Sequence, residues 1–360
     1  MGKILSRFKG MVSKMYLFHN DYNECCHPHV LAKMQEFQQA QMPGYGCDSC
    51  CEKASASIRR LCDRDDIAVH FLVGGTQTNL TVISSALRPH QAVLGAQTAH
   101  INVHETGAIE ATGHKVVTVI SPDGKLTAGQ IERVAQAQLA DETAEHVVQV
   151  KMVYLSDSTE LGTIYKLDEL EAISAVCKKY GFYLYIDGAR LSYALTAAEN
   201  DVTLADLARL CDVFYIGGTK CGAMFGEAVV ITNPSIAEDF RYMIKQKGGM
   251  LAKGWLLGLQ FQALFENDLY FEIAARANRY AEQLCGTLER LGYEFLIPGC
   301  TNQVFPILPN WLLAALEKDF SFSLQEIIDE NNKAVRFCTS WATMQESIDA
   351  LCDALMHYTL

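Results

Sequence analysis

Short apolar runs of strand length alternate with amphipathic helical patterns over residues 67–231, and this alternation constrains the fold most. Apolar residues at helical spacing fill 127–139 and 167–180, and Gly181 follows the second pattern as a C-terminal stop. The pattern predicts an α/β domain whose mainly parallel sheet is covered by helices on both faces. The strand-like runs, rich in β-branched and aromatic residues, are 70–73, 115–120, 150–155, 182–186, 213–216 and 228–231.

The character of the sequence changes after Pro234. Long helical stretches over 235–291 lead into short strands near Phe295 and at 304–308, and a further strand is expected at 335–338. A chain of 360 residues is long enough for one large and one smaller domain. We therefore predict three parts, with the main boundary near residue 260. They are an N-terminal arm (1–20), a large domain (21–260) and a small C-terminal α+β domain (261–360).

The charge balance bears on the possible partners. Lys and Arg total 30 against 42 Asp and Glu, and the net charge of −12 argues against a nucleic-acid-binding protein, which needs a basic surface. No apolar run reaches the roughly 18 residues that span a bilayer, and the N-terminus lacks a signal-peptide core. We expect a cytoplasmic protein that binds no membrane. The first six residues fit the loose pattern for N-myristoylation, but a frayed basic arm is the plainer interpretation.

Thirteen cysteines in a chain without an export signal predict reduced thiols rather than disulfides. Five of them could together supply zinc ligands, but the sequence lacks the usual arrangement of two C-x-x-C pairs. We predict no metal site, and a metal-binding redox module remains an alternative that metal analysis would test. The five are Cys25, Cys26, Cys47, Cys50 and Cys51.

The first of three polar segments at predicted strand ends covers residues 74–79. Gly74 and Gly75 let the backbone approach an anion closely, and the Thr76 hydroxyl and the freed amides can donate to it. A helix expected to start near Leu80 would direct its positive end at the same point. A simple tight turn between strand and helix explains the segment equally well.

The second segment begins with Asp187, which follows the apolar run 182–186. A carboxylate at the end of a buried strand is costly unless it meets a cation. A protonated pyridine nitrogen is such a cation, and Asp187 would keep the ring an electron sink. The alternative is a local turn pair between Asp187 and Arg190.

The third segment places Lys220 among small residues at 216–223. A desolvated lysine has a lowered pKa and a nucleophilic amine, the small neighbours leave room for a flat ring, and Thr219 can donate to its phosphate. A surface lysine in a glycine loop is the alternative. Because ligands of open α/β sheets gather at the carboxyl ends of the strands, the three segments together predict a pyridoxal 5'-phosphate (PLP) site.

The order of these motifs, with a histidine-containing segment at 98–104, resembles the threonine aldolases of the aromatic-amino-acid β-eliminating lyase superfamily. The resemblance runs from about residue 18 to the end of the chain. It implies PLP fold type I, the aspartate-aminotransferase type, and a homodimer or homotetramer. It also implies a lyase that cleaves a 3-hydroxy amino acid, such as L-threonine or L-allo-threonine, to glycine and an aldehyde.

The resemblance implies cofactor-binding roles for particular residues. Lys220 would carry PLP as a Schiff base, Asp187 would pair with the pyridine nitrogen, and His100 would stack on the ring. His100 and an ordered water are both candidates for the catalytic base. The residues expected to hold the PLP phosphate are Gly75, Thr76 and Gln77.

The substrate carboxylate would be bound by Arg190 and Arg336, whose guanidinium groups suit bidentate contacts. Asn20 stands at or near a position where the family usually has a serine, and Tyr45 begins a Tyr-Gly-Cys-Asp segment in place of the family's Tyr-Gly-Asp-Asp. Both departures leave the substrate range open. His104 is expected to have a structural role, or else to reach the β-hydroxyl or orient His100.

Lys245 and Lys247 resemble a basic loop that reaches the cofactor phosphate of a neighbouring subunit. The same apparatus could support β-elimination or racemisation, because only the groups around Cβ decide which bond breaks. A non-catalytic protein that keeps the fold is a further alternative, and the set of Asp187, Lys220 and Arg336 argues against it.

Overall fold

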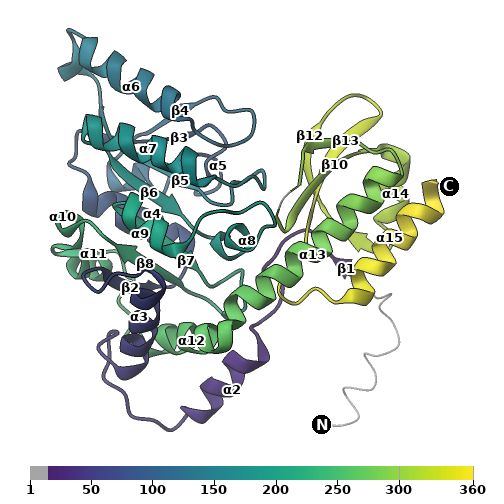
Figure 1. Cartoon of the computed structure of the whole chain (residues 1–360), viewed down its shortest axis with the longest axis horizontal. Helices are drawn as coiled ribbons and strands as arrows, with labels where there is room; N and C mark the ends of the chain where they lie inside the picture. The colour runs from purple at the N-terminus through teal and green to yellow at the C-terminus, as the bar shows by residue number, and fades with distance from the viewer. Residues whose placement is uncertain (1–14, 300, 360) are drawn as a thin grey trace. The chain divides into compact units, whose positions relative to one another are not determined.

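The computed structural model describes residues 15–299 and 301–359, and these fall into two compact units (Figure 1). The larger unit is Cys25–Ala275, and the smaller joins residues 15–24 to residues 276–359. The boundary expected near residue 260 falls inside helix α12 (Trp255–Phe265), whereas the observed division follows Ala275. Helix α12 packs against α3 and α2, which keeps it in the larger unit.

A seven-stranded sheet forms the centre of the larger unit, with strand order β2-β8-β7-β6-β5-β3-β4. Strand β8 alone runs antiparallel to its neighbours in this sheet, so the prediction of a mainly parallel sheet is confirmed. The strands are β2 (Ala68–Leu72), β3 (Gln91–Ala96), β4 (Val116–Val119), β5 (Gln149–Ser156), β6 (Tyr183–Asp187), β7 (Val213–Gly217) and β8 (Glu227–Ile231).

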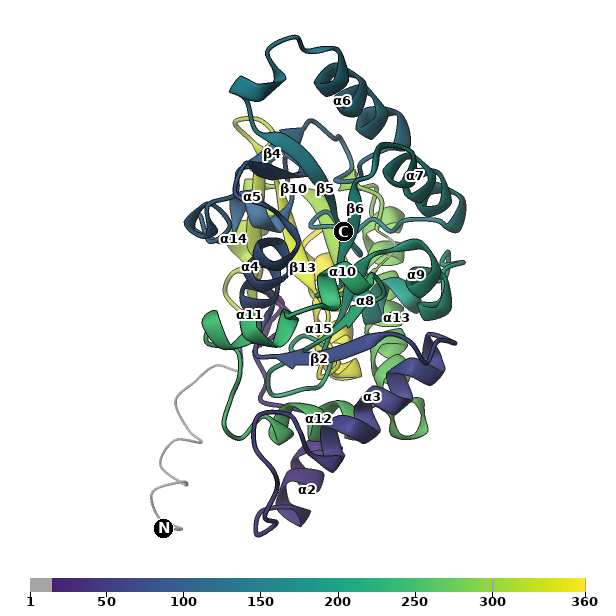
Figure 2. The same ribbon diagram turned by 90° about the vertical axis from the view of Figure 1, so that its left-hand side faces the viewer.

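Helices cover both faces of this sheet, as expected from the sequence. Figures 1 and 2 show α6 (Ala128–Ala140), α7 (Leu167–Tyr180) and α9 (Leu204–Leu210) along one face and α4 (Gly75–Ala86) along the other. Helices α10 and α11 pack against α4. The other helices of this unit are α2 (Pro28–Glu36), α3 (Ser49–Leu61), α5 (His100–Val103), α8 (Leu191–Leu195), α10 (Pro234–Ala237) and α11 (Phe240–Gln246), with 3-10 turns η1 (Glu110–Thr112), η2 (Ala144–His146) and η3 (Glu266–Asp268).

Strand β3 is the one strand of the seven-stranded sheet that the sequence pattern did not predict. Its sequence is Gln-Ala-Val-Leu-Gly-Ala, and every residue of it is buried. Alanine and glycine have low strand propensity, so the segment lacks the β-branched signal that identifies its neighbours. By contrast, the helix at 167–180 and its stop at Gly181 are confirmed, since Gly181 has a φ of +68°.

The smaller unit holds a four-stranded antiparallel sheet, order β12-β13-β10-β9, and a two-stranded pairing of β1 with β11. The strands expected near Phe295, at 304–308 and at 335–338 are confirmed. The strands are β1 (Tyr16–Leu17), β9 (Phe295–Ile297), β10 (Gln303–Pro309), β11 (Phe320–Ser321), β12 (Ser323–Ile327) and β13 (Asn332–Cys338), with helices α14 (Asn310–Leu316) and α15 (Gln345–Thr359). Helix α13 (Leu269–Arg290) contains the division between the units.

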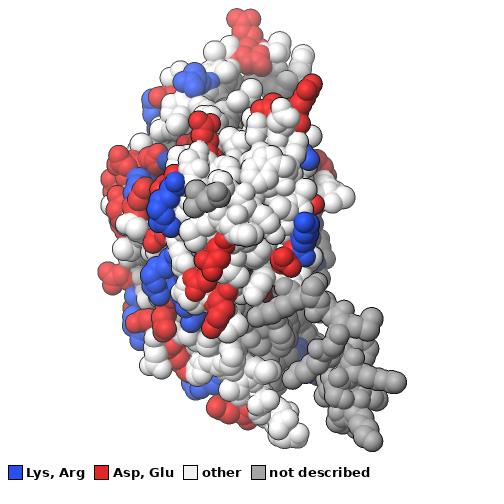
Figure 3. Space-filling view, turned by 90° about the vertical axis from the view of Figure 1, so that its right-hand side faces the viewer, with Lys and Arg blue, Asp and Glu red and all other residues white. Residues whose placement is uncertain are grey.

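Residues 1–14, which carry the myristoylation pattern and most of the expected arm, lie outside the described residues. Residues 16–17 of that arm form β1 instead, because they pair with β11. On the face of the molecule in Figure 3, acidic and basic side chains are mixed, and no continuous basic stripe crosses its described surface. None of the described helices is both long enough and apolar enough to cross a membrane.

Candidate active site

One cavity of about 170 Å³ lies at the carboxyl ends of the parallel strands of the larger unit. It brings together the three segments singled out in the sequence. Residues from these segments that line the cavity are Gly74, Gly75, Thr76, Asp187, Arg190, Thr219 and Lys220, and His100, Ser156, Ser158, Glu160, Tyr215 and Glu227 complete much of its wall.

The turn that follows β2 presents backbone donors to this cavity. Helix α4 begins at Gly75 rather than near Leu80, so the glycines lie in its first turn. No side chain caps this end, which leaves its first amides able to bind an anion. A Cβ on Gly75 would lie 3.0 Å from the Tyr215 hydroxyl, so a side chain would crowd the cavity.

Gln77 does not line the cavity, although the sequence placed it with the phosphate-binding residues. Its Oε1 accepts a hydrogen bond from the Val73 amide at 3.3 Å, and its Nε2 donates to the Lys247 carbonyl at 3.4 Å. The side chain therefore links the turn after β2 to the segment at Lys247. Any phosphate contact of Gln77 stays a prediction.

Asp187 ends β6 and is 4% exposed. Its Oδ1 accepts hydrogen bonds from the Tyr215 hydroxyl and from the Ala189 amide, the latter at 3.0 Å. Its Oδ2 accepts from the Tyr154 hydroxyl at 2.5 Å and from Asn79 Nδ2 at 3.0 Å. Four donors therefore hold a carboxylate that the surrounding strands remove from water.

These contacts decide the charge of Asp187. Burial disfavours the carboxylate, but the charge of His100 and the hydrogen bonds from Tyr154, Tyr215 and Ala189 outweigh it and lower the pKa of Asp187. The group is thus an anion at neutral pH. The proposed turn pair with Arg190 is not needed to keep it charged.

Three buried tyrosines around Asp187 were missed by the sequence reasoning. Tyr154, Tyr185 and Tyr215 each stand two residues before the end of β5, β6 or β7. Because side chains alternate along a strand, this spacing puts each tyrosine on the same face as the strand's last residue. That repeated position is the signal that could have found them. The Tyr185 hydroxyl donates to Asn79 Oδ1 at 2.6 Å, which orients the amide toward Asp187.

Lys220 follows β7, and its loop contacts the buried carboxyl group of Glu227, the first residue of β8. The Thr219 hydroxyl donates to Glu227 Oε1 at 2.8 Å, and the Gly218 amide donates to Glu227 Oε2 at 3.0 Å. Burial raises the pKa of Glu227 to about 8, against the opposing effects of Thr219 and the Lys220 charge. The Thr219 hydroxyl is therefore engaged by Glu227, rather than pointing free toward a phosphate as the sequence suggested.

His100 opens helix α5 after the unpredicted strand β3. Its Nδ1 lies 2.8 Å from Glu105 Oε1, and the same oxygen accepts from Asn79 Nδ2 at 2.7 Å. Burial opposes the imidazolium form, but the Glu105 hydrogen bond and the Asp187 charge outweigh it and raise the pKa of His100. Glu105 is 5% exposed and was missed in the sequence, because its role depends on a contact five residues away around a turn.

His104 lies beside His100, with ring centroids 5.5 Å apart. Glu105 orients His100 through the hydrogen bond to Nδ1. The backbone amide of His104 donates to the His100 carbonyl at the end of α5. The roles considered for the His104 side chain stay predictions.

The loop after β5 forms the remaining wall. Glu160 Oε1 accepts from the Ser156 hydroxyl at 2.6 Å and from the His100 amide at 2.9 Å. Burial raises the pKa of Glu160, and the Asp187 charge adds to this against the effects of Ser156 and His100. Ser158, on the same loop, has a buried hydroxyl with no hydrogen-bond partner among the described residues.

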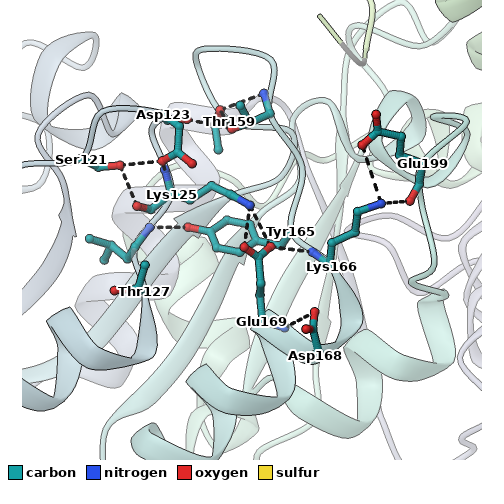
Figure 4. Close-up of polar contacts among 12 residues, drawn as sticks. Ser121, Asp123, Lys125, Thr127, Thr159, Tyr165, Lys166, Asp168, Glu169 and Glu199 are labelled. Atoms are coloured by element: carbon teal, nitrogen blue, oxygen red, sulfur yellow. Dashed lines mark hydrogen bonds and ion pairs between the residues drawn. The ribbon is translucent and has the colours of Figure 1, made fainter. Parts of the chain in front are cut away.

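A polar network holds this loop in place on its outer side (Figure 4). Lys125 Nζ lies 2.7 and 2.8 Å from the two carboxylate oxygens of Glu169, at the start of α7. The Tyr165 hydroxyl accepts from the Leu126 amide at 2.7 Å. Because the Lys166 amide donates to Glu169 Oε2, these contacts hold the C-terminal end of the segment over residues 156–166.

Asp157 lies on this loop but does not line the cavity, and its Oδ1 has no partner among the described residues. Burial raises its pKa from 3.8 to about 7. Between these two values the folded chain keeps a proton that the unfolded chain has lost, so the free energy of unfolding falls as pH rises through this window. We expect Asp157→Asn to gain stability over wild type as pH rises from 4 to 8 in denaturant titrations. A pH-independent difference between the two proteins would contradict this.

Two predicted substrate residues lie in the smaller unit. Asn20 Oδ1 accepts from the Tyr22 amide at 3.0 Å. Arg336, on β13, donates from Nη2 to the His19 carbonyl at 3.3 Å. The structure therefore brings the segment before Asn20 together with Arg336, although they are far apart in the sequence.

Tyr45 lines a different cavity of the larger unit, of about 380 Å³, and not the one that Lys220 lines. Arg241 Nη2 donates to the Tyr45 carbonyl at 3.1 Å, and the Tyr45 amide donates to the Ala252 carbonyl at 3.2 Å. These contacts fix its loop away from the Lys220 cavity within the chain. Lys245 Nζ lies 5.2 Å from the centre of the Tyr45 ring.

The cysteine segments form no metal site among the described residues, where no group of three or more His, Cys, Asp or Glu could hold an ion. No disulfide links the cysteines that the structure describes. Burial raises the pKa of the Cys51 thiol, which donates to the Gly254 carbonyl. Cys50 and Cys51 thus behave as buried helix residues of α3.

Comparisons with known proteins identify the family of the chain. Residues 28–309 match the family model described as beta-eliminating lyase. A low-specificity L-threonine aldolase of Pseudomonas sp. (strain NCIMB 10558) is 33% identical over 337 residues, which cover 92% of this chain and 94% of that protein. A low-specificity L-threonine aldolase of Saccharomyces cerevisiae is 26% identical over 72% of this chain.

Solved structures give the same result. A threonine aldolase of Leishmania major is 48% identical, with a TM-score of 0.93, over 96% of this chain and 100% of that chain. An aspartate aminotransferase of Thermus thermophilus, at 16% identity and a TM-score of 0.69 over 99% of this chain, is alike in fold alone. The predicted fold, PLP fold type I, is thereby confirmed. The chain therefore belongs to the beta-eliminating lyase family, and within that family to the threonine aldolases.

Proposed function

We propose that the chain is a PLP-dependent aldolase that cleaves a 3-hydroxy amino acid such as L-threonine or L-allo-threonine to glycine and an aldehyde. The observation that carries the proposal is one cavity lined by a lysine after β7 and by a buried, ionised aspartate at the end of β6. The names of the similar proteins from Pseudomonas and Leishmania support the same activity.

The residues of the cavity fit PLP. Asp187 is an anion held away from water, and a pyridinium nitrogen is the kind of cation that such a carboxylate requires. The uncapped start of α4 supplies amides for a phosphate, and the absence of a side chain at Gly74 and Gly75 leaves room for it. The buried, unpartnered hydroxyl of Ser158 on the same wall is a further donor for a polar ligand.

When bound, PLP supplies an electron sink for the pair released from the Cα–Cβ bond. Lys220 would hold it covalently through Nζ, and Asp187 would keep a proton on the pyridine nitrogen. Gly75 and Thr76 would bind the phosphate. His100, oriented by Glu105 and kept toward its charged form, would pack on the ring and offer a donor to the substrate.

The substrate itself needs an anchor for its carboxylate. Arg190, on the cavity wall, would bind one side of it, and we assign the other side to Arg336 with help from the Asn20 segment. A bidentate guanidinium contact would fix the Cα–Cβ bond relative to the ring. The chemistry that follows depends on a base at the β-hydroxyl.

We also propose that the working enzyme is a homodimer or homotetramer. Tyr45, on the loop before α3, and Lys245, in the last turn of α11, lie close together, and neither lines the Lys220 cavity of the same chain. Their predicted substrate and phosphate roles are therefore assigned to the cavity of a neighbouring subunit. A monodisperse and fully active monomer by light scattering would overturn this.

The proposal is tested by the absorbance spectrum of the PLP-loaded protein with glycine, L-threonine or L-allo-threonine, with aldehyde release followed in parallel. We expect a Schiff-base band that shifts on addition of glycine and acetaldehyde release from threonine. Pyruvate and ammonia as products would assign β-elimination instead, and loss of optical activity without aldehyde would assign racemisation. A protein that gives no Schiff-base band would overturn the PLP assignment.

A further inference from the structure

Retro-aldol cleavage requires a base for the β-hydroxyl proton, and the sequence left this group open between His100 and an ordered water. A base must lie on the cavity wall, have an oxygen or nitrogen lone pair directed into the cavity, and be deprotonated near neutral pH. Each of the cavity's titratable groups can be judged by these three requirements.

His100 is a poor candidate for a group with a lone pair directed into the cavity. Its Nδ1 is tied to Glu105, and the Glu105 contact together with the Asp187 charge moves the imidazole toward its proton-loaded form. An imidazolium can donate but cannot accept. Asp187 is excluded for another reason, because four hydrogen-bond donors occupy its two oxygens. Glu227 is engaged through both oxygens by Thr219 and Gly218.

Glu160 meets the requirements of position and of an available lone pair. It is a partly buried carboxyl on the wall of the cavity that Lys220 and His100 also line. Both of its hydrogen bonds are accepted by Oε1, from Ser156 and from the His100 amide. Oε2 accepts no hydrogen bond from a described residue, so its lone pairs are available to a ligand. The loop that carries it is held by the Thr163 hydroxyl, which donates to the Asp123 carbonyl, and by the Tyr165 hydroxyl, which accepts from the Leu126 amide.

We propose that Glu160 is the catalytic base of the cleavage that we infer above, and that its Oε2 takes the β-hydroxyl proton of the substrate. The O–H electron pair then forms the carbonyl of the aldehyde while the Cα–Cβ bond breaks. The pair from that bond remains on the glycine fragment, and Cα takes up one proton in place of the one that Glu160 received. Protons and electrons balance, and no further reactant is needed.

The electrostatics of Glu160 suit this role. Burial and the Asp187 charge raise its pKa, which makes its carboxylate a stronger base than an exposed glutamate. The ionisable groups that interact with it are Asp187 on β6, His100 on α5, and Tyr154 and Tyr165 on the two sides of its loop. We therefore expect the acid limb of the pH profile of kcat/KM to lie above the range of an ordinary glutamate and to disappear in Glu160→Gln.

Glu160→Gln keeps the shape and the hydrogen bonds of the side chain but removes the base. We expect kcat for threonine cleavage to fall on the order of 10²- to 10⁴-fold, the usual contribution of a general base. Glycine carries no β-hydroxyl, so its dissociation constant, followed by the absorbance change, should stay within about threefold. Its α-proton exchange in D₂O, followed by NMR, should change as little.

Two further variants separate chemistry from structure. Asp157→Asn removes a buried carboxyl three residues earlier on the same loop, outside the cavity, and should leave cleavage within about threefold. Glu160→Ala should regain part of its cleavage rate with added formate, which replaces the missing carboxylate, and not with chloride.

Several results would overturn the role of Glu160. One is a Glu160→Gln enzyme that cleaves threonine within about threefold of wild type. Another is an equal loss of glycine binding and of cleavage, which would make the residue structural. These outcomes are distinct from failure of the proposed function, because in that case the wild-type protein would itself release no aldehyde.

Discussion

Lys220→Ala is expected to lose threonine cleavage by more than about 10⁴-fold and to lose the Schiff-base absorbance band. The reason is that, among the described residues, Lys220 is the one lysine that lines the cavity with Asp187 and the start of α4. If the Lys220 amine is removed, only contacts to the phosphate and to the ring would hold PLP. The substrate would then have no covalent exchange partner to displace, so both binding and turnover change together.

The covalent role of Lys220 can be measured without turnover. Borohydride reduction of the PLP-loaded wild-type protein should add the mass of the cofactor to the peptide that contains Lys220, and the alanine variant should gain none. Lys178→Ala is the matched control, because Lys178 is an exposed lysine in the last turn of α7. A Lys220→Ala protein that still cleaves threonine at the wild-type rate would refute the assignment.

The strands and the three polar segments could be predicted because each carries a local signal. Asp187 follows an apolar run, and Lys220 lies among glycines at the end of another. Parallel strands place their carboxyl ends at one edge, so local signals sufficed to group these residues. Strand β3 contains alanine and glycine, which have low strand propensity, so its residues carry no strand signal. The sequence therefore did not predict the strand that precedes His100.

The partners of these residues could not be predicted in the same way. Glu105 reaches His100 around a turn, and Glu160 reaches the His100 amide from a loop 60 residues away. Neither stands in a periodic pattern, and both are acids in polar segments that resemble solvated loops. Their roles follow from a cavity that only the assembled sheet creates. The division of the chain was also misplaced, because the packing of α12 on α3 is a long-range contact.

Asp187→Ala is expected to be the most damaging single change for stability, and it should also impair catalysis. It removes the acceptor for Tyr154, Tyr215, Asn79 and the Ala189 amide, and each buried donor left without a partner costs about 1–3 kcal/mol. Because some donors can re-pair, we expect a net loss of about 3–5 kcal/mol in the free energy of unfolding. Cleavage should fall by roughly 10²- to 10³-fold or more, since a buried charge is lost from the cavity.

Asp187→Asn separates charge from shape and makes a prediction about pH. The folded pKa of Asp187 is lowered, so its ionised form stabilises the fold above the pKa of an unfolded aspartate. That contribution is lost as pH falls through the folded pKa. The advantage of wild type over Asp187→Asn in free energy of unfolding should therefore grow as pH rises through the folded pKa and level off once the pH exceeds the pKa of an unfolded aspartate, about 4.

For Asp157→Asn, a variant at the same edge of the sheet, we expect the opposite pH dependence of stability. Asp157 carries a pKa raised to about 7 by burial, so its ionisation destabilises the fold and the asparagine variant gains on wild type as pH rises. Two buried aspartates joined by a backbone hydrogen bond, from the Asp157 amide to the Asp187 carbonyl at 2.9 Å, should thus respond to pH with opposite signs. Denaturant titrations of both variants from well below pH 4 to pH 8 would measure the difference, because Asp187 responds below its ordinary pKa of 3.8 and Asp157 responds between 3.8 and about 7. Parallel pH responses would mean that burial alone, and not the donors around Asp187, sets both charges.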